Sequence, residues 1–139
     1  MKAYLDTSAL LRLVLAEPEP LEELRRAEQL VSSELLAVES RRTIDRLHRL
    51  GALSLEEAAR RLELVTDWLE AVDLILLRAP VLARASEPLP TALGTLDALH
   101  LATALVWRDR LNESLIIATH DGELGLAGRA FGFDVIGVP

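Results

Sequence analysis

Three aspartates occupy positions where a carboxylate carries an energetic cost. Asp6 ends a short apolar segment near the start of the chain, and Asp121 directly follows a second apolar segment. Asp97 begins a segment of helical length in which almost every other residue is apolar. A buried carboxylate without a partner destabilises a fold by several kcal/mol. Each of these side chains is therefore expected to cap a helix, to pair with a cation or to bind a metal ion.

Helix capping is the first explanation to weigh for each aspartate. Aspartate is a preferred N-cap residue, and each position taken singly is more often a cap than a catalytic group. Together the three favour another explanation, because caps have no reason to converge whereas metal ligands must. Ligands of an open parallel sheet bind at the carboxyl ends of its strands, where Asp6 and Asp121 are expected to lie. The pattern therefore favours a site made of several carboxylates.

Other kinds of site do not fit the sequence. The chain has no cysteine, which excludes disulfides and thiolate chemistry. It has no glycine-rich phosphate loop, no zinc-ligand spacing and no defensible serine-histidine-aspartate order. Carboxylates are hard ligands that suit Mg²⁺ or Mn²⁺ better than zinc.

Four acidic motifs of this sequence resemble those of PIN-domain nucleases. The matching residues, in chain order, are Asp6 in YLDTSALL, Glu39 in SSELLAVE, Asp97 in TLDALHLATA and Asp121 in IIATHDGEL. Glu34 also lies near the second motif, but Ser33 stands six residues ahead of Glu39, as the family's serine does. One departure lies in the last motif, where His120 stands in place of the usual basic or small residue.

The resemblance implies a single PIN-like domain over residues 1–139, an α/β fold whose parallel sheet has helices on both faces. It also implies a ribonuclease with one or two Mg²⁺ or Mn²⁺ ions in a carboxylate pocket. Asp6, Asp97 and Asp121 are the expected metal ligands. Asp121 is an alternative orienting group for the attacking water, and Glu39 completes the pocket. The hydroxyl groups expected to hold these carboxylates belong to Thr7, Ser8 and Thr119.

The length of the chain narrows the type of PIN-domain protein that it resembles. A stand-alone domain of 139 residues is more similar to VapC-type toxins of toxin–antitoxin pairs than to RNA-processing nucleases. That similarity implies an RNA substrate, an antitoxin protein as partner, a homodimer and a cytoplasmic location. A shared fold does not define a substrate. An RNA-processing nuclease without an antitoxin is therefore the alternative within the family.

Two functions outside the family also fit part of the pattern. A phosphatase of the haloacid-dehalogenase type would use Asp6 as its nucleophile. That chemistry needs a second aspartate two residues later, where this chain has Ser8. A non-catalytic binding module would use the acids only as helix caps, and a metal titration distinguishes it from a nuclease.

Basic residues near the second motif are candidates for phosphate binding. Arg42, Arg46 and Arg49 follow Glu39 at helical spacing, so they share one side of that helix. An equally common explanation is a solvated face whose arginines pair with neighbouring acids.

Two histidines adjoin the motif aspartates. His100 lies one helical turn after Asp97, a spacing at which its side chain could reach the pocket, but in an apolar helix a satisfied core histidine is the stronger expectation. His120 directly precedes Asp121 in an extended segment, so its side chain is expected to point away from the pocket. Neither histidine is assigned to the site.

The composition agrees with a packed α/β domain. Half of the residues are hydrophobic and only 4% are aromatic, so the core is expected to consist mainly of Leu, Ala and Val. The net charge of −7 is unusual for an RNA-binding protein, but four of the acids are assigned to a metal pocket. No segment approaches the roughly 18 apolar residues of a membrane span, and the first residues do not resemble a signal peptide.

Apolar strand-like and helical segments alternate along the chain, which predicts a parallel sheet. The expected strands are 2–6, 29–32, 73–77, 115–118 and 135–138. The expected helices are 7–16, 21–28, 34–50, 54–71, one from about 80 to the prolines at 88 and 90, 95–109 and 121–131. Ser33 and Ser54 are the expected N-caps of the third and fourth of these helices.

Overall fold

The computed structural model describes all residues from 1 to 139 and confirms the α/β class. Five parallel strands form one sheet in the order β3-β2-β1-β4-β5. They are β1 (Lys2–Leu5), β2 (Gln29–Ser33), β3 (Val72–Ile75), β4 (Ile116–Ala118) and β5 (Asp134–Ile136). Because β1 is the middle strand, Asp6 lies at the centre of the sheet's carboxyl edge.

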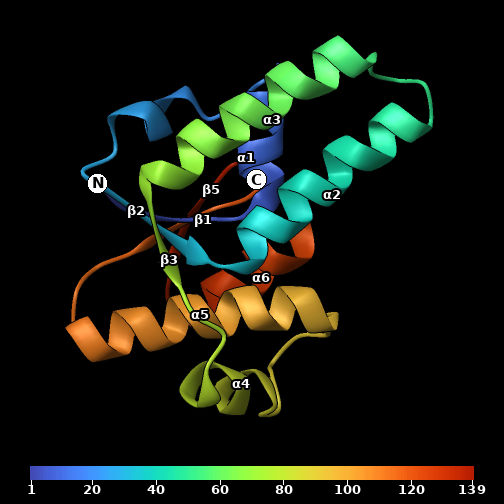
Figure 1. The fold of residues 1–139 in the computed structure, drawn as a ribbon. Coiled ribbons are helices and arrows are strands. Elements are labelled where there is room, and N and C mark those ends of the chain that lie inside the picture. The colour runs from blue at the N-terminus through green and yellow to red at the C-terminus, as the bar shows by residue number, and fades with distance from the viewer.

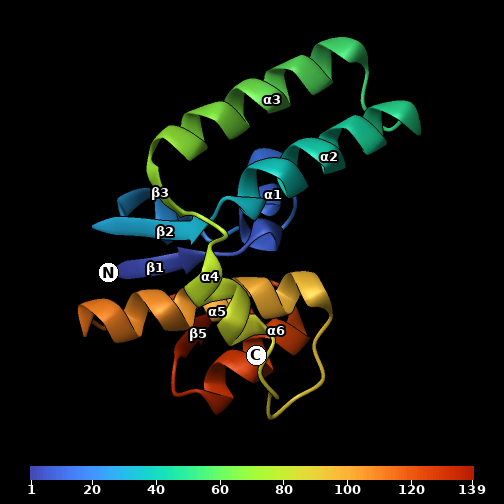
Figure 2. The same cartoon turned by 60° about the horizontal axis from the view of Figure 1, so that its bottom comes forward.

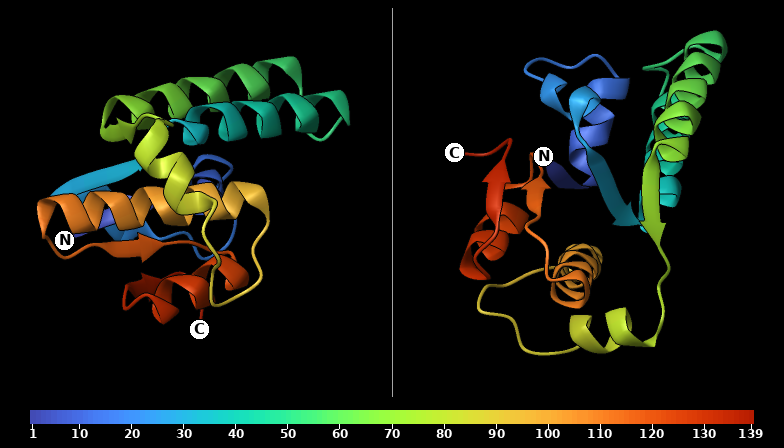
Figure 3. Two further views of the ribbon diagram at one scale, coloured as in Figure 1. Left: turned by 90° about the horizontal axis from the view of Figure 1, so that it is seen from below. Right: turned by 90° about the vertical axis from the view of Figure 1, so that its left-hand side faces the viewer.

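Helices cover both faces of the sheet (Figure 1). They are α1 (Thr7–Val14), α2 (Leu35–Arg49), α3 (Leu55–Glu70), α4 (Ala79–Ala85), α5 (Thr95–Leu111) and α6 (Gly122–Ala130), with a 3-10 helix, η1 (Glu22–Arg26). Helices α1, α2 and α3 pack on one face, and α5 and α6 pack on the other. Helix α4 lies against α5, as both views of Figure 3 show.

Alternation along the strands gives each face its own core. Ala3 and Leu5 of β1 belong to the core beneath α1, α2 and α3, together with Leu10 of α1. Tyr4, between them, belongs to the core beneath α5 and α6, together with Leu105 of α5. Strands of a covered parallel sheet are buried on both sides, and β1 has that pattern.

Helices α2 and α3 form a hairpin that extends past the end of the sheet (Figure 2). Leu36 and Ile44 of α2 and Val65 of α3 attach it to the core. Ser54 Oγ accepts a hydrogen bond of 3.1 Å from the N–H of Glu57, which confirms the predicted N-cap of α3.

Helix α2 begins slightly later than the sequence predicts. Ser33 Oγ accepts a hydrogen bond of 3.1 Å from the N–H of Leu35, but Glu34 occupies the N-cap position. The Glu34 carboxylate accepts a hydrogen bond of 3.0 Å from the N–H of Leu77. Glu34 therefore secures the connection from β3 to α4.

Most predicted element ends lie one to three residues from the observed ones, and three of the differences have a visible physical reason. Strand β3 ends at Ile75 instead of residue 77, because the Leu77 N–H bonds to a side chain and not to a neighbouring strand. Strand β5 ends at Ile136 instead of residue 138, because Gly137 has a φ of 99°. Helix α5 continues to Leu111 and is followed by Asn112 in the left-handed conformation.

None of the helices combines the length and the hydropathy that a membrane span requires.

Candidate active site

Asp6 lies at the junction of β1 and α1 and is 4% exposed. Its Oδ2 atom accepts hydrogen bonds from the hydroxyl groups of Ser8, at 2.6 Å, and Thr119, at 2.7 Å. Asp6 stands at the N-cap position of α1, but its side chain accepts no backbone N–H there. Capping therefore does not account for this carboxylate. The other oxygen, Oδ1, lies 3.8 Å from Nε2 of His100.

Asp121 lies at the start of α6, just beyond the end of β4. Its Oδ1 atom accepts a hydrogen bond of 2.9 Å from the N–H of Leu124, so this aspartate is the N-cap of α6. The cap uses one oxygen only, and Oδ2 makes no hydrogen bond to the protein. The capping explanation thus holds for Asp121 without excluding a second role.

Asp97 lies in the first turn of α5 and is partly buried. The N-cap position of α5 belongs to Gly94, so Asp97 is not the cap. It takes part in no salt bridge. Burial, followed by the negative charges of Asp121 and Asp6, raises the pKa of Asp97 to about 6. The charge of His100 acts in the opposite direction but does not outweigh these effects, and Asp97 has no salt-bridge partner.

Glu39 of α2 is held by donors from two other helices. The hydroxyl group of Thr7 donates to its Oε1 at 2.9 Å, and Nε2 of His100 lies 2.5 Å from the same atom. Burial alone would raise the pKa of Glu39. The hydrogen bond and the positive charge of His100, with the Thr7 bond, outweigh burial and lower that pKa. Glu39 is thus stabilised as an anion.

His100 is a buried residue with two partners. It is 1% exposed, and its Nδ1 lies 2.6 Å from the hydroxyl group of Tyr4. In a neutral ring, the Tyr4 hydroxyl donates to Nδ1 while Nε2 donates to Glu39. The sequence predicts a satisfied core histidine that could reach the pocket, but it does not predict Glu39 as the partner. The one available signal was its spacing, one helical turn after Asp97.

The four acids of the motifs, which we call the acidic site, therefore come together from four different elements. Asp6, Asp121 and Glu39 all act on the charge of Asp97. The three predicted hydroxyl residues contact these acids: Thr7 contacts Glu39, and Ser8 and Thr119 contact Asp6. Glu34 is bonded to Leu77 on the β3–α4 connection.

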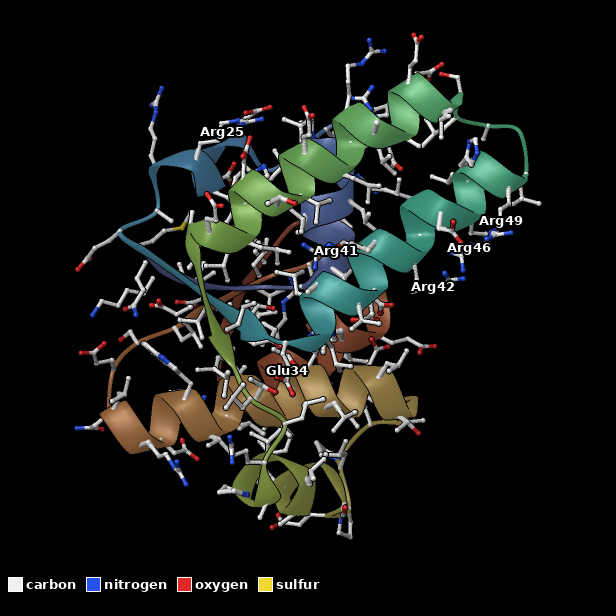
Figure 4. All side chains as sticks on the ribbon, viewed as in Figure 1. Arg25, Glu34, Arg41, Arg42, Arg46 and Arg49 are labelled. Carbon is white, nitrogen blue, oxygen red and sulfur yellow. The ribbon has the colours of Figure 1, made fainter.

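The three arginines proposed for RNA differ in their surroundings. Arg42, Arg46 and Arg49 follow one another along the same side of α2, and Arg41 lies on a different side (Figure 4). Arg42 and Arg49 both bond to Asp45, at 3.0 Å and 2.9 Å. Arg46 forms no salt bridge. The solvated-face explanation therefore applies to two of the three side chains.

The donor set of the acidic site fits a hard divalent cation in chemical type. Asp6, Asp97 and Asp121 each have at least one carboxylate oxygen free of hydrogen bonds to the protein. As the side chains stand, no group of three or more acidic or histidine residues is arranged to hold one ion. The residues have the oxygen ligands that such an ion prefers and a negative charge that it would offset. Binding would require their side chains to change conformation.

Two comparisons with known proteins bear on this site. Residues 3–128 match the family model described as PIN domain, a range that includes all four acids. "Ribonuclease VapC47" of Mycobacterium tuberculosis is 33% identical over 137 residues, which cover 94% of this chain and 92% of that protein.

Proposed function

This chain belongs to the PIN-domain family, and we propose that it is an endoribonuclease that hydrolyses RNA with Mg²⁺ or Mn²⁺ as its cofactor. The observation that carries the proposal is the state of Asp97. Its carboxylate is partly buried among three other acids, has no salt bridge, and has a pKa raised to about 6 by burial and by the charges of Asp121 and Asp6. A bound cation would offset this repulsion.

Asp6, Asp97 and Asp121 are the proposed metal ligands, and Glu39 completes the acidic site. Two of the ligands have one oxygen fixed and one free. The hydroxyl groups of Ser8 and Thr119 fix Oδ2 of Asp6, and the cap of α6 fixes Oδ1 of Asp121. Fixing one oxygen orients the other without occupying it, which is how neighbouring groups usually prepare a ligand.

A divalent cation bound here would supply a water of lowered pKa and would neutralise charge on the scissile phosphate. The protein residues position the groups around that chemistry. Glu39 remains ionised at neutral pH, because His100 and Thr7 hold its pKa below the ordinary value against the effect of burial. Asp121, with Oδ2 free, is suited to ligate the ion or to accept a hydrogen bond from the attacking water.

We assign Arg42, Arg46 and Arg49 to the phosphates of the RNA chain beyond the cleavage site. They lie on α2, the helix that carries Glu39, and they follow one side of that helix away from its start (Figure 4). Guanidinium groups bind phosphate through paired hydrogen bonds.

We further propose that the protein is a single-domain, cytoplasmic toxin that forms a homodimer and is neutralised by an antitoxin protein. The support is the similarity to Ribonuclease VapC47, which extends over nearly the whole length of both chains. An RNA-processing nuclease without an antitoxin is the alternative.

The test of the nuclease proposal combines cleavage with metal binding. A pool of single-stranded RNA oligonucleotides should be cleaved with Mg²⁺ or Mn²⁺ and not with EDTA. Millimolar Mn²⁺ should raise the Tm, because the ion binds only the folded protein. Asp6→Asn and Asp97→Asn should each abolish cleavage and leave the circular dichroism spectrum unchanged, since each removes a charge and keeps the side-chain volume.

Asp67→Asn is the matched control, because Asp67 is exposed on α3 and far from the acidic site in sequence. It should cleave RNA as the wild-type protein does. Cleavage retained by Asp6→Asn or Asp97→Asn would reject the role of that residue. A protein whose Tm does not respond to either metal and that cuts no RNA would be a non-catalytic module.

A further inference from the structure

We propose that residues 136–139, which we call the strap, position the metal-binding carboxylate of Asp6 through Thr119 and His120. The inference rests on the proposed nuclease function, because it gives a role in that site to residues outside the four acids. It follows from hydrogen bonds that join the end of β5 to the β4–α6 connection, and from bonds that join this connection to Asp6.

The strap is bonded to the β4–α6 connection at two points. The N–H of Thr119 donates to the carbonyl of Ile136 at 3.0 Å, and Nδ1 of His120 bonds to the carbonyl of Gly137 at 2.9 Å. A Cβ atom at Gly137 would lie 2.2 Å from the carbonyl oxygen of Thr119, and the φ of this glycine is +99°. Glycine is therefore required for the strap to approach this closely.

Ser8 and Thr119 link the β4–α6 connection to the carboxylate of Asp6 by hydrogen bonds. Both hydroxyl groups donate to Oδ2 of Asp6, so the 3.2 Å contact between the two hydroxyl oxygens is not a further hydrogen bond. Each hydroxyl oxygen instead accepts a backbone N–H of the connection. His120 donates to Ser8 at 2.9 Å, and Asp121 donates to Thr119 at 3.0 Å. The orientation of the carboxylate thus depends on the backbone beside the strap.

The hydrogen-bonding capacity of His120 identifies its ring as a donor to the strap. A carbonyl oxygen can only accept, so Nδ1 of His120 must carry the proton in its bond to Gly137. Nε2 of the same ring is buried and has no partner. An unpaired buried nitrogen is unfavourable for stability, so the one favourable polar contact of this ring is its bond to the strap.

The outer end of the strap is held by α6. Arg129 donates to the backbone oxygens of Val138, at 3.0 Å, and Pro139, at 2.8 Å. A Cβ atom at Gly125 would lie 2.5 Å from Cγ2 of Val138, so α6 and the strap are in direct contact. Because the strap is fixed beyond Gly137, enlarging Gly137 has to displace Thr119.

Two substitutions test the strap in different ways. His120→Ala removes the bond to Gly137 without adding a clash, and His120→Asn restores an N–H donor. Gly137→Ala introduces the clash with Thr119. Gly51→Ala is its control, because Gly51 also has a positive φ, +80°, but an added Cβ would have no neighbour within 4 Å.

Three measurements separate positioning from general stability. The apparent Mn²⁺ affinity is taken from the rise in Tm with metal concentration, and RNA cleavage gives kcat and KM. Amide hydrogen exchange at Thr119 and Asp121 needs neither metal nor RNA. His120→Ala and Gly137→Ala should weaken Mn²⁺ binding and lower kcat by about 10-fold or more. KM for RNA should stay within about twofold, and exchange should accelerate.

His120→Asn should recover most of the Mn²⁺ affinity, and Gly51→Ala should bind Mn²⁺ as the wild-type protein does. A folded His120→Ala variant with wild-type Mn²⁺ affinity, kcat and exchange would overturn the proposal. If Gly137→Ala does not fold, the His120→Ala variant is sufficient to decide between the two outcomes. A wild-type protein with neither a Mn²⁺ response nor cleavage would overturn the nuclease proposal instead. The exchange rates would still decide whether the strap restrains Thr119.

Discussion

The carboxylates of the acidic site differ in how their charges are compensated. Glu39 has two donors, and its pKa is lowered although burial acts to raise it. Asp97 has no such donor, and burial and then the charges of Asp121 and Asp6 raise its pKa to about 6. A group whose pKa is higher in the folded than in the unfolded chain binds its proton preferentially in the fold. Ionisation of Asp97 therefore weakens the metal-free fold as the pH rises through about 6.

Asp97→Asn should consequently raise the Tm of the metal-free protein at about pH 7.5 and have almost no effect at about pH 3. Asparagine resembles the protonated acid, so only the ionised wild-type residue differs from it. With allowance for solvent screening of a partly exposed group, the gain is about 1 kcal/mol, or roughly 3–5 °C. Thermal scans in EDTA at both pH values measure it, with Asp67→Asn as control. Equal Tm values of Asp97→Asn and the wild-type protein at the higher pH would contradict a repulsion between Asp97 and the other acids.

Arg46→Ala should reduce the salt dependence of RNA binding more than Arg42→Ala. Arg42 and Arg49 share Asp45, whereas Arg46 has no acidic partner. Each phosphate contact with single-stranded RNA contributes about 0.7 to the slope of log affinity against log salt. Combining both substitutions should flatten the slope further, and Asp45→Asn should raise the affinity by freeing two guanidinium groups.

Arg42, Arg46 and Arg49 form the arginine row of α2. Arg41→Ala is the control for this row, because Arg41 lies on a different side of the helix (Figure 4). Fluorescence anisotropy with a labelled RNA in EDTA, over a series of salt concentrations, measures binding without cleavage. If the slope of log affinity against log salt is the same for all variants, these arginines form a solvated face and do not bind RNA.

Single residues of the site were accessible from the sequence where they stand alone in an apolar context. The sequence predicts Asp6, Asp97 and Asp121 in this way, and the resemblance to the family adds Glu39 as a further candidate. The bond between Glu39 and His100 was not accessible, because the two residues are 61 positions apart and meet only when α2 and α5 pack across the sheet edge. Which oxygen of each carboxylate accepts a hydrogen bond, and which remains free, likewise depends on tertiary contacts.

At the scale of elements, His100 joins three segments of the chain. It connects Tyr4 of β1 to Glu39 of α2 from its own position in α5. The backbone N–H of Ser33, at the end of β2, adds a bond of 3.2 Å to the Tyr4 hydroxyl group. The carboxyl edge of the sheet is thus tied together by side chains as well as by the strand ladder.

His100→Ala should lower the free energy of unfolding by about 2–4 kcal/mol, because it leaves a buried hydroxyl and a partly buried carboxylate without their partner. RNA cleavage should fall as well, since Glu39 loses the donor that holds it. Urea denaturation measures the first effect. Tyr4→Phe keeps the aromatic ring and should cost less than His100→Ala. A His100→Ala variant as stable as the wild-type protein would show that the link has no energetic role.

The order and type of the elements were predictable because apolar periodicity alternates between strand and helix along the chain. Their ends were less predictable where a distant side chain decides them. Strand β3 is short because Glu34, on the connection from β2, takes the N–H of Leu77. Strand β5 is short because Gly137 turns away to approach Thr119. Neither contact has a local signal in the sequence.

At the scale of the whole molecule, the charge distribution reconciles a net charge of −7 with an RNA substrate. Four acids gather at the carboxyl edge of the sheet, where a cation would offset them, and the arginine row follows α2 from the same edge (Figure 4). The local field that an RNA meets is therefore different from the overall charge. Composition gives only the net charge, and not the separation of the four acids from the arginines.

The same accumulation of negative charge predicts how a partner would inhibit the protein. A segment of an antitoxin that presents an arginine or lysine to the acidic site would pair with the carboxylates that we propose as metal ligands. Co-expression with the product of the neighbouring gene should yield a stable complex without nuclease activity, and proteolysis of the partner should restore cleavage. Asp97→Asn should weaken the complex, because it removes one of the charges that attract the cation, whereas Asp67→Asn should not. A protein that is harmless when expressed alone, copurifies with nothing and cuts one defined precursor RNA would instead be an RNA-processing nuclease.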